Sequence, residues 1–371
     1  MTTGDAWPGR ALAAVLGRVT VTEAEVGERF PLYADPGDGR WTTTGRGSWT
    51  GGFWAGLLWL RARATGSAAD RSAAARCTAR LAPWATADTA TRGLILWYAT
   101  ALAFDTEEAD ALQEAAGRAC LASYDPESGT VPWGAAFGGP RLLARADGVP
   151  GLVPLLARTG GEGPAVAAAH LHRHLCLFLG EEHEEHEEHA DSGGRPRPAW
   201  RFDAATGWHP CPDPAPGWSR GEAWMLLAVA DALLCPEVAG RRPERLTRAA
   251  EQLLTRTEAL TGPLVPPDHA SSPQPVLDTS AAAVTAVALL KLARAGVPRA
   301  ALCSLRAEAV LKRLAEDHLT GPGSGRPAGM LLDGCYDAAQ GVAVRHELIW
   351  GDFFLALGLA ALDGLVDITR V

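Results

Sequence analysis

The sequence lacks C-x-x-C pairs, membrane-length apolar runs and any basic stripe. Its seven cysteines are scattered and odd in number, which argues against a disulfide framework or a cysteine zinc site and fits a reducing compartment. The net charge of -9 argues against a nucleic-acid or anionic-membrane surface. Where a signal peptide would carry positive charge, the first residues carry Asp5, and Arg10 and Arg18 interrupt the apolar stretch that follows. We therefore expect a cytoplasmic protein that binds neither nucleic acid nor membrane.

Alternating strand patterns are almost absent, and helix-period patterns fill the chain. Hydrophobic residues make up 47% of the sequence, and segments such as "TSAAAVTAVALLKLA" are apolar on most faces, so a second layer must cover them. Regularly spaced helix pairs suggest repeated two-helix units. We predict an all-α fold, an (α/α)6 barrel of six helical hairpins forming one domain over residues 1–371. The expected helices are 8–27, 51–65, 69–83, 92–104, 107–121, 149–159, 163–179, 219–234, 241–258, 279–295, 298–315 and 351–364.

The exception is a low-complexity His/Glu loop at 180–198. His183, His186 and His189 repeat every third residue among glutamates, which resembles a metal-binding pattern. A spacing of three drifts around a helix, however, and this composition is typical of a solvated loop. We favour the loop and predict no metal or other cofactor.

Tryptophans gather beside glycine-rich turns that precede predicted helices. Aromatic side chains inside helices usually belong to the core. At a helix start, beside an arginine or an acid, they also suit a sugar-stacking platform with a charged clamp. If the loops between hairpins meet at one end of the barrel, these residues would line one funnel. The residues in question are Trp49, Trp54, Trp59, Trp218, Arg220, Trp224, Trp350 and Asp352.

Four segments of the chain, in their order along it, resemble segments of the unsaturated glucuronyl hydrolases of glycoside hydrolase families 88 and 105. "TGGFWAGLLWL" is similar to the first-hairpin signature of the family. "WSRGEAW" resembles W-[SA]-R-G-Q-A-W, with Glu222 in place of the usual Gln. "DTSAAAVTAVALLKLA" and the closing "LLDGCYDA…IWGDFFLALGLAAL" resemble two further family segments. The resemblance spans most of the chain and implies the same barrel.

The resemblance also implies a reaction and an acid. Such enzymes act on a 4,5-unsaturated uronic acid: an Asp protonates C4 of the vinyl ether, water adds at C5, and the resulting hemiketal collapses to release the aglycone. "RADGVPGLVPLLA" matches the segment that carries this acid, so Asp147 is the candidate general acid and base. The alternative is that Asp147 only caps the helix predicted to start near Val149, as Asp often does.

The sequence departs from the family at other positions of the site. The family has a second acid in H-D-[LI]-G-F, whereas "ATRGL" places Ala90 at the His, Thr91 at the Asp and Arg92 next to it. Asp88 aligns elsewhere, and a substrate-contacting His before the "DAATG" turn is missing. His170 matches a family histidine for which we expect a structural role. The altered lining indicates a changed substrate, such as a specialised metabolite. The predicted substrate-binding residues are Trp54, Thr91, Arg92, Trp218, Arg220 and Trp224.

Two roles are predicted for the arginines. Arg220 would pair with the substrate carboxylate while Trp54 or Trp224 stacks on the sugar ring. Arg92, if it points inward, would either make Asp147 a poorer acid or hold a second anionic group on the substrate. The partner expected is thus a small molecule or an oligosaccharide.

Two other classes of protein remain as alternatives. A catalytically silent or repurposed barrel that binds a sugar or a partner would explain the missing second acid, although Asp147, Trp54, Arg220 and Trp224 weigh against it. A lanthionine cyclase or terpene cyclase would need a Cys/Cys/His zinc set or an Asp-rich metal motif, and the sequence has neither.

Overall fold

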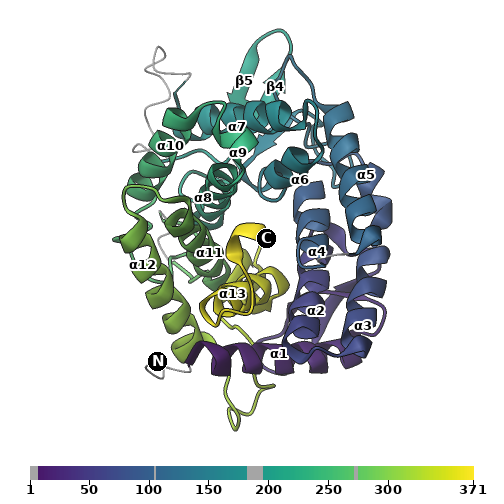
Figure 1. Cartoon of the computed structure of the whole chain (residues 1–371). Helices are drawn as coiled ribbons and strands as arrows, with labels where there is room; N and C mark the ends of the chain where they lie inside the picture. The colour runs from purple at the N-terminus through teal and green to yellow at the C-terminus, as the bar shows by residue number, and fades with distance from the viewer. Residues whose placement is uncertain (1–6, 104–105, 182–194, 271–274) are drawn as a thin grey trace.

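The computed structural model describes residues 7–103, 106–181, 195–270 and 275–371. Its helices form two concentric rings around a central axis (Figure 1). The prediction of an (α/α)6 barrel is confirmed. The inner ring consists of α2 (Gly51–Thr65), a π-helical turn (Gly93–Trp97) continued by α4 (Tyr98–Thr100), α6 (Leu152–Arg158), α8 (Ser219–Leu234), α11 (Thr279–Ala295) and α13 (Ile349–Leu362). The outer ring consists of α1 (Trp7–Val26), α3 (Ala68–Ala79), α5 (Glu107–Ser123), α7 (Gly163–Leu179), α10 (Pro243–Arg256) and α12 (Ala300–Arg313), with the short α9 (Pro236–Ala239) before α10.

Most predicted helices are confirmed to within a few residues, but three end early or start late. The segment predicted as 69–83 is α3 followed by a separate 3-10 turn, Ala82–Thr86. The segment predicted as 92–104 begins as the π-helical turn, and α6 starts at Leu152 instead of Val149. No described helix is long and apolar enough to cross a membrane.

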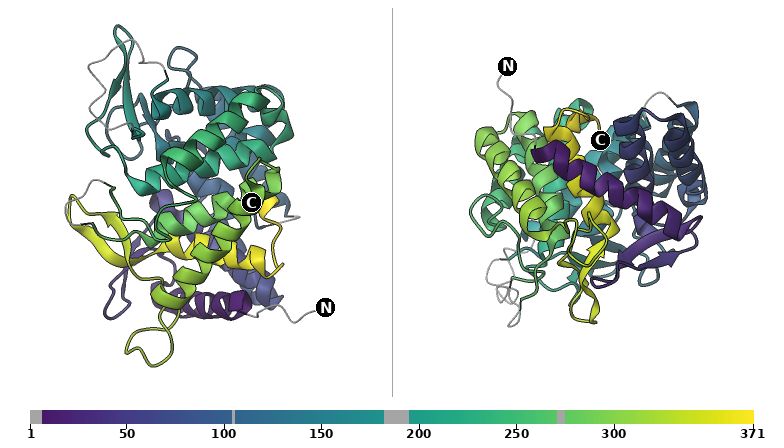
Figure 2. Two further views of the ribbon diagram at one scale, coloured as in Figure 1. Left: turned by 90° about the vertical axis from the view of Figure 1, so that its left-hand side faces the viewer. Right: turned by 90° about the horizontal axis from the view of Figure 1, so that it is seen from below.

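The two ends of the barrel differ because the connections differ in length. Each inner helix except the last, α13, passes to the next outer helix through a short loop, as between α2 and α3 or between α11 and α12. Each outer helix returns to the next inner helix through a longer segment. The short loops and the long segments therefore lie at opposite ends, and all inner helices begin at the end with the long segments. Figure 2 shows the strand hairpins projecting on one side.

The sequence prediction includes no strands, whereas the described parts of the long segments contain seven short ones. A four-stranded antiparallel sheet has the order β2 (Trp41–Thr44), β1 (Phe30–Ala34), β7 (Val342–Leu348), β6 (Gly334–Asp337). A three-stranded antiparallel sheet has the order β3 (Leu143–Arg145), β4 (Ala199–Asp203), β5 (Gly207–Pro210). Strands this short, some of them half-buried on both faces as β5 is, give no alternating pattern to detect. They fix the segments that surround the candidate site.

The site end of the barrel depends on close backbone contact at Gly93. A Cβ on Gly93 would come within 2.1 Å of the Leu152 nitrogen and 2.5 Å of the Pro150 carbonyl oxygen. No side chain fits there without moving the backbone that leads from Asp147 into α6. Glycine at position 93 is thus required by packing.

We expect Gly93→Ala to lower the free energy of unfolding by about 3 kcal/mol, because overpacking against backbone cannot be relieved by a rotamer change. Urea denaturation measures this loss. Gly17→Ala is the matched control: Gly17 is an exposed residue of α1 with nothing within 4 Å of its added Cβ, so stability should rise by up to about 1 kcal/mol. Equal effects of the two substitutions would contradict the packing argument.

Candidate active site

Asp147 lies in a 3-10 turn, Ala146–Gly148, between β3 and α6. Its two carboxylate oxygens accept hydrogen bonds from Arg145: Nε to Oδ1 at 3.1 Å and the terminal nitrogen to Oδ2 at 3.3 Å. The side chains of Arg145 and Asp147 remain 24% and 19% exposed, so both are accessible to a ligand. The alternative role as helix cap is wrong, because Gly151 is the N-cap of α6.

Arg145 connects the candidate acid to an aromatic surface. Its guanidinium lies 5.0 Å from the centre of the Trp133 ring, in cation–π geometry. Burial alone would lower the pKa of Arg145, but the charge of Asp147 and the hydrogen bonds to it raise that pKa above its ordinary value. An arginine, an acid and a half-buried indole therefore share one partly exposed surface.

Two buried histidines of α7 support this turn from below. His170 Nδ1 accepts a hydrogen bond from the Val131 amide at 3.0 Å, which leaves Nε2 to donate to the Gly148 carbonyl at 3.4 Å. Burial lowers the pKa of His170 well below its usual range, and it lowers the pKa of His174 to about 4. Both rings are therefore neutral at pH 7. The contacts of His170 agree with the structural role predicted for it.

The residues that the sequence motif predicts at the position of the second acid do not offer a carboxylate. Thr91 pairs its hydroxyl with that of Thr89 at 2.8 Å, and both are buried. Arg92 is 3% exposed and points to α5, where it donates to Cys120 Sγ and Ser123 Oγ. Its guanidinium is thus directed at the outer ring, so the conditional role of Arg92 towards Asp147 or a second anionic group does not apply.

Asp88 is the acid that lies close in sequence to this position. Its carboxylate accepts hydrogen bonds from Arg141 Nε and from the Ala135 amide, both at 3.1 Å, and its side chain is 41% exposed. These contacts attach it to the loop that carries Trp133. Asp88 therefore has the surroundings of a loop anchor.

Arg220 joins three segments of the barrel end. It donates to Asp278 Oδ2 at 2.6 Å, to the Cys335 carbonyl at 2.5 Å and to the Tyr336 carbonyl at 2.7 Å, and it is 3% exposed. The predicted pairing of Arg220 with a substrate carboxylate does not fit this geometry, because its terminal nitrogens already have buried acceptors. Arg220 instead fixes α8 to the start of α11 and to β6.

The predicted stacking tryptophans fall into two groups. Trp54 and Trp224 are buried, at 3% and 1% exposed. Trp224 packs between Phe53, with ring centroids 6.3 Å apart, and Phe354, at 5.5 Å, so it belongs to the aromatic core. Trp218 is half-buried, and the Arg220 guanidinium lies 5.1 Å from its ring centre. Of these three, Trp218 presents the largest exposed surface.

Sequence reasoning missed Arg145 and Trp133. Arg145 stands within the quoted motif but two residues before the acid, and Trp133 follows no predicted helix start. A glycine-rich stretch around Trp133, "PWGAAFGG", was the available signal. The His/Glu repeat with His183, His186 and His189 lies outside the described residues. Within the described ranges, no three His, Cys, Asp or Glu residues gather as a metal site would require.

The sequence and the fold were compared with those of known proteins. No protein-family model matches the chain. The unsaturated glucuronyl hydrolase of Bacillus sp. (strain GL1) is 25% identical over 381 residues, covering 95% of this chain and 96% of that protein. The crystal structure of that enzyme, described as responsible for the degradation of glycosaminoglycan, matches with a TM-score of 0.78 and 21% identity over 96% of this chain and 97% of that one.

Two further structures agree. The unsaturated glucuronyl hydrolase of Streptococcus agalactiae matches with a TM-score of 0.77 and 16% identity, covering 98% of this chain and 93% of that one. An unsaturated glucuronyl hydrolase specific for heparin matches with a TM-score of 0.78 and 19% identity, covering 98% and 100%. The chain is an (α/α)6-barrel protein by fold. It is a distant, full-length relative of the unsaturated glucuronyl hydrolases.

Proposed function

We propose that the chain is a hydrolase that acts on an unsaturated uronic acid or a related sugar-bearing compound by protonating and hydrating a vinyl ether double bond. The observation that carries this proposal is the accessible Asp147 in the turn before α6, beside Arg145 and Trp133. The distant relationship to unsaturated glucuronyl hydrolases supports it. Relatives of this kind bind unsaturated oligosaccharides, such as dGlcA-GalNAc6S in one S. agalactiae structure.

In this proposal Asp147 is both acid and base. It donates a proton to C4 of the substrate, then takes one from the water that adds at C5, and the hemiketal so formed opens to release the aglycone. The ion pair with Arg145 in the free protein leaves Asp147 without a proton, so the pair must separate and Asp147 must take up a proton from water before it can donate one to C4. A substrate carboxylate can cause that separation, because it offers Arg145 an alternative anionic partner with the same planar geometry.

Arg145 therefore takes the role that the sequence suggested for Arg220. It is the arginine next to the candidate acid, and it is partly exposed, whereas Arg92 and Arg220 are each 3% exposed. Exchange of Asp147 for the substrate carboxylate would bind the substrate and free the acid in one event. Trp133 and Trp218 are two half-buried indoles that we assign to stacking on the sugar.

We expect Arg145→Gln to raise the KM for an unsaturated uronide about 10- to 100-fold, because one charge-assisted hydrogen-bonded contact is lost. Steady-state kinetics with wild-type protein and variant measure the change. Arg118→Gln is the matched control: that arginine is 61% exposed and pairs with Glu114 on the same helix, α5, so KM should change less than about twofold. An unchanged KM in Arg145→Gln would remove Arg145 from substrate binding.

A panel of unsaturated uronides with different aglycones tests the function itself. Loss of the conjugated enol-acid absorbance together with release of the aglycone is the expected result. Saturated glycosides of the same aglycones serve as the comparison and should not react. Turnover of the saturated glycosides would contradict the proposal. So would the absence of turnover with every unsaturated uronide of the panel.

A barrel that binds sugars without catalysis is the second candidate. The observation that favours it is the buried Thr89–Thr91 hydroxyl pair at the aligned position of the second acid. Binding of several unsaturated uronides without turnover, at equal affinity in wild type and Asp147→Asn, is the result that this candidate predicts.

A further inference from the structure

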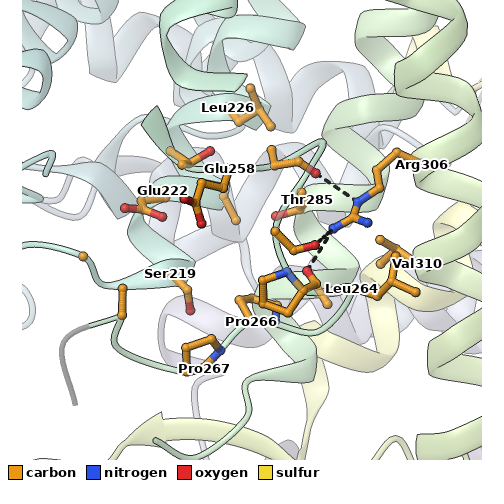
Figure 3. Close-up of a pocket in the computed structure, with 18 of the residues that line it drawn as sticks. Ser219, Glu222, Leu226, Glu258, Leu264, Pro266, Pro267, Thr285, Arg306 and Val310 are labelled. Atoms are coloured by element: carbon orange, nitrogen blue, oxygen red, sulfur yellow. Dashed lines mark hydrogen bonds between the residues drawn. The ribbon is translucent and has the colours of Figure 1, made fainter. Parts of the chain in front are cut away.

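A cavity of about 220 Å³ opens between the two helical rings, beside the first turns of α8 (Figure 3). Neither Asp147 nor Arg145 lines it. Its walls come from the first turns of α8, from α11 and α12, and from the segment that follows α10. They are largely apolar and include Leu226, Leu264, Pro266, Pro267 and Val310.

One carboxyl group in this cavity has an oxygen without a partner. Glu222 is 9% exposed, and its Oε1 is buried with no hydrogen-bond partner. Burial raises the pKa of Glu222 to about 7; the charge of Arg195 opposes the rise and that of Glu258 adds to it. Glu222 stands where the family motif has Gln. A buried carboxyl group without a partner is costly, so a ligand that supplies a partner would be bound favourably.

A second carboxylate, that of the exposed Glu258, lines the same cavity. Glu258 follows α10 with φ of 52°, a left-handed conformation, and its carbonyl accepts hydrogen bonds from the Thr261 and Gly262 amides at 3.0 and 2.7 Å. Figure 3 shows Glu222 and Glu258 at one side of the cavity, with the prolines and Val310 beyond them. Two carboxylates that share one space favour a cation between them.

Arg306, on the wall opposite the two glutamates, directs its N–H donors at backbone carbonyls and not into the cavity. Arg306 Nε donates to the Ala259 carbonyl at 3.2 Å, and a terminal nitrogen donates to the carbonyls of Gly262 and Pro263 (Figure 3). These bonds fix the loop that forms the far side of the cavity. Arg306 therefore shapes the wall and does not offer a fork to an anionic ligand.

We propose that this cavity binds a small organic amine, with its ammonium group between Glu222 and Glu258 and its apolar body against Leu226, Leu264 and Val310. An anionic ligand is disfavoured because it would meet two carboxyl groups. A neutral ligand would fill the apolar part but would add no positive charge beside the carboxylate pair to that of Arg195. The ammonium group satisfies the free oxygen of Glu222 as well as its charge.

The proposal predicts how binding depends on pH. The charged groups that face Glu222 are Glu258 after α10, Arg195 and, on α12, Arg306. An ammonium ligand binds the ionised carboxylate, so it must displace a proton wherever the pH lies below about 7. Affinity should therefore rise as pH rises, by roughly tenfold between about pH 6 and 8.

Calorimetric titration with benzylamine and with benzyl alcohol, which has the same shape without the charge, tests the proposal on the full chain. We expect benzylamine to bind at least about tenfold more tightly than benzyl alcohol at the upper end of that pH range. Glu222→Gln should remove both this preference and the pH dependence. Glu258→Gln should weaken benzylamine binding by a smaller factor, and Glu237→Gln, an exposed glutamate of α9, should change nothing.

Equal binding of the amine and the alcohol by wild-type protein would overturn the proposal. So would benzylamine binding that is unaffected in Glu222→Gln. Neither outcome depends on turnover of a uronide, so the result is independent of the function proposed for Asp147.

Discussion

Replacing Asp147 by Asn is expected to lower kcat for the true substrate by at least about 100-fold, while the affinity for that substrate changes little. Asn keeps the size and shape of the side chain but has no proton to donate, and general acid–base catalysis by one residue contributes about 10²–10⁴-fold. The substitution also removes the anionic partner of Arg145, which leaves Arg145 free for the substrate carboxylate. Steady-state kinetics and calorimetry on the same preparation separate the two effects.

Asp213→Asn is the control for this experiment. Asp213 is an exposed acid whose charge also acts on Arg145, so it tests the loss of a nearby negative charge without the loss of the candidate acid. We expect its kcat to stay within about threefold of wild type. A similar fall in both variants would indicate a general electrostatic effect, and an unchanged kcat in Asp147→Asn would remove Asp147 from catalysis.

Arg220→Ala should lower the free energy of unfolding by about 3–5 kcal/mol, because it leaves the buried carboxylate of Asp278 without its counter-charge. Asp278 is 0% exposed and also caps α11 through the Ser280 amide. The change would release the contacts from Arg220 to the Cys335 and Tyr336 carbonyls as well. Urea denaturation monitored by tryptophan fluorescence measures the loss.

The double variant Arg220→Met with Asp278→Asn serves as the comparison. It removes both charges and keeps the cap, so it should recover part of the stability that Arg220→Ala loses. A loss below about 1 kcal/mol in Arg220→Ala would mean that Arg220 is not the structural link described above. Its role as a ligand for the substrate would then need to be considered again.

The helical rings could be predicted from the sequence because packing in two layers imposes a strong pattern. Inner helices such as α11 and α13 are apolar on nearly every face, and the two ends of α11 are marked by the "DTS" cap at Asp278 and by Gly296. The strands could not be predicted in the same way. β3 has three residues, and its pairing partner β4 lies far along the chain; β5 has four residues and pairs with the neighbouring β4 in a short hairpin.

The sequence was enough to locate the candidate site, but it could not predict which side chains of the site contact one another. The resemblance to the family identified the segment with Asp147, whereas the direction of Arg92 and the partners of Arg220 depend on residues far away in sequence, such as Cys120 and Asp278. Adjacent helix positions point about 100° apart, so no local pattern decides which of Thr91 and Arg92 faces inward. The pairing of Arg145 with Asp147 likewise required the backbone geometry of the turn.

The fate of the C4 position of the substrate tests the central claim most directly. Wild-type protein is incubated with an unsaturated uronide in deuterated water, and the products are followed by NMR and mass spectrometry. If Asp147 delivers a solvent-exchanged proton to C4, the uronic acid product gains one deuterium at C4 as the aglycone is released. The Asp147→Asn variant should show neither deuterium at C4 nor release of the aglycone. Release of the aglycone without deuterium at C4, or no reaction with any unsaturated uronide, would contradict the account.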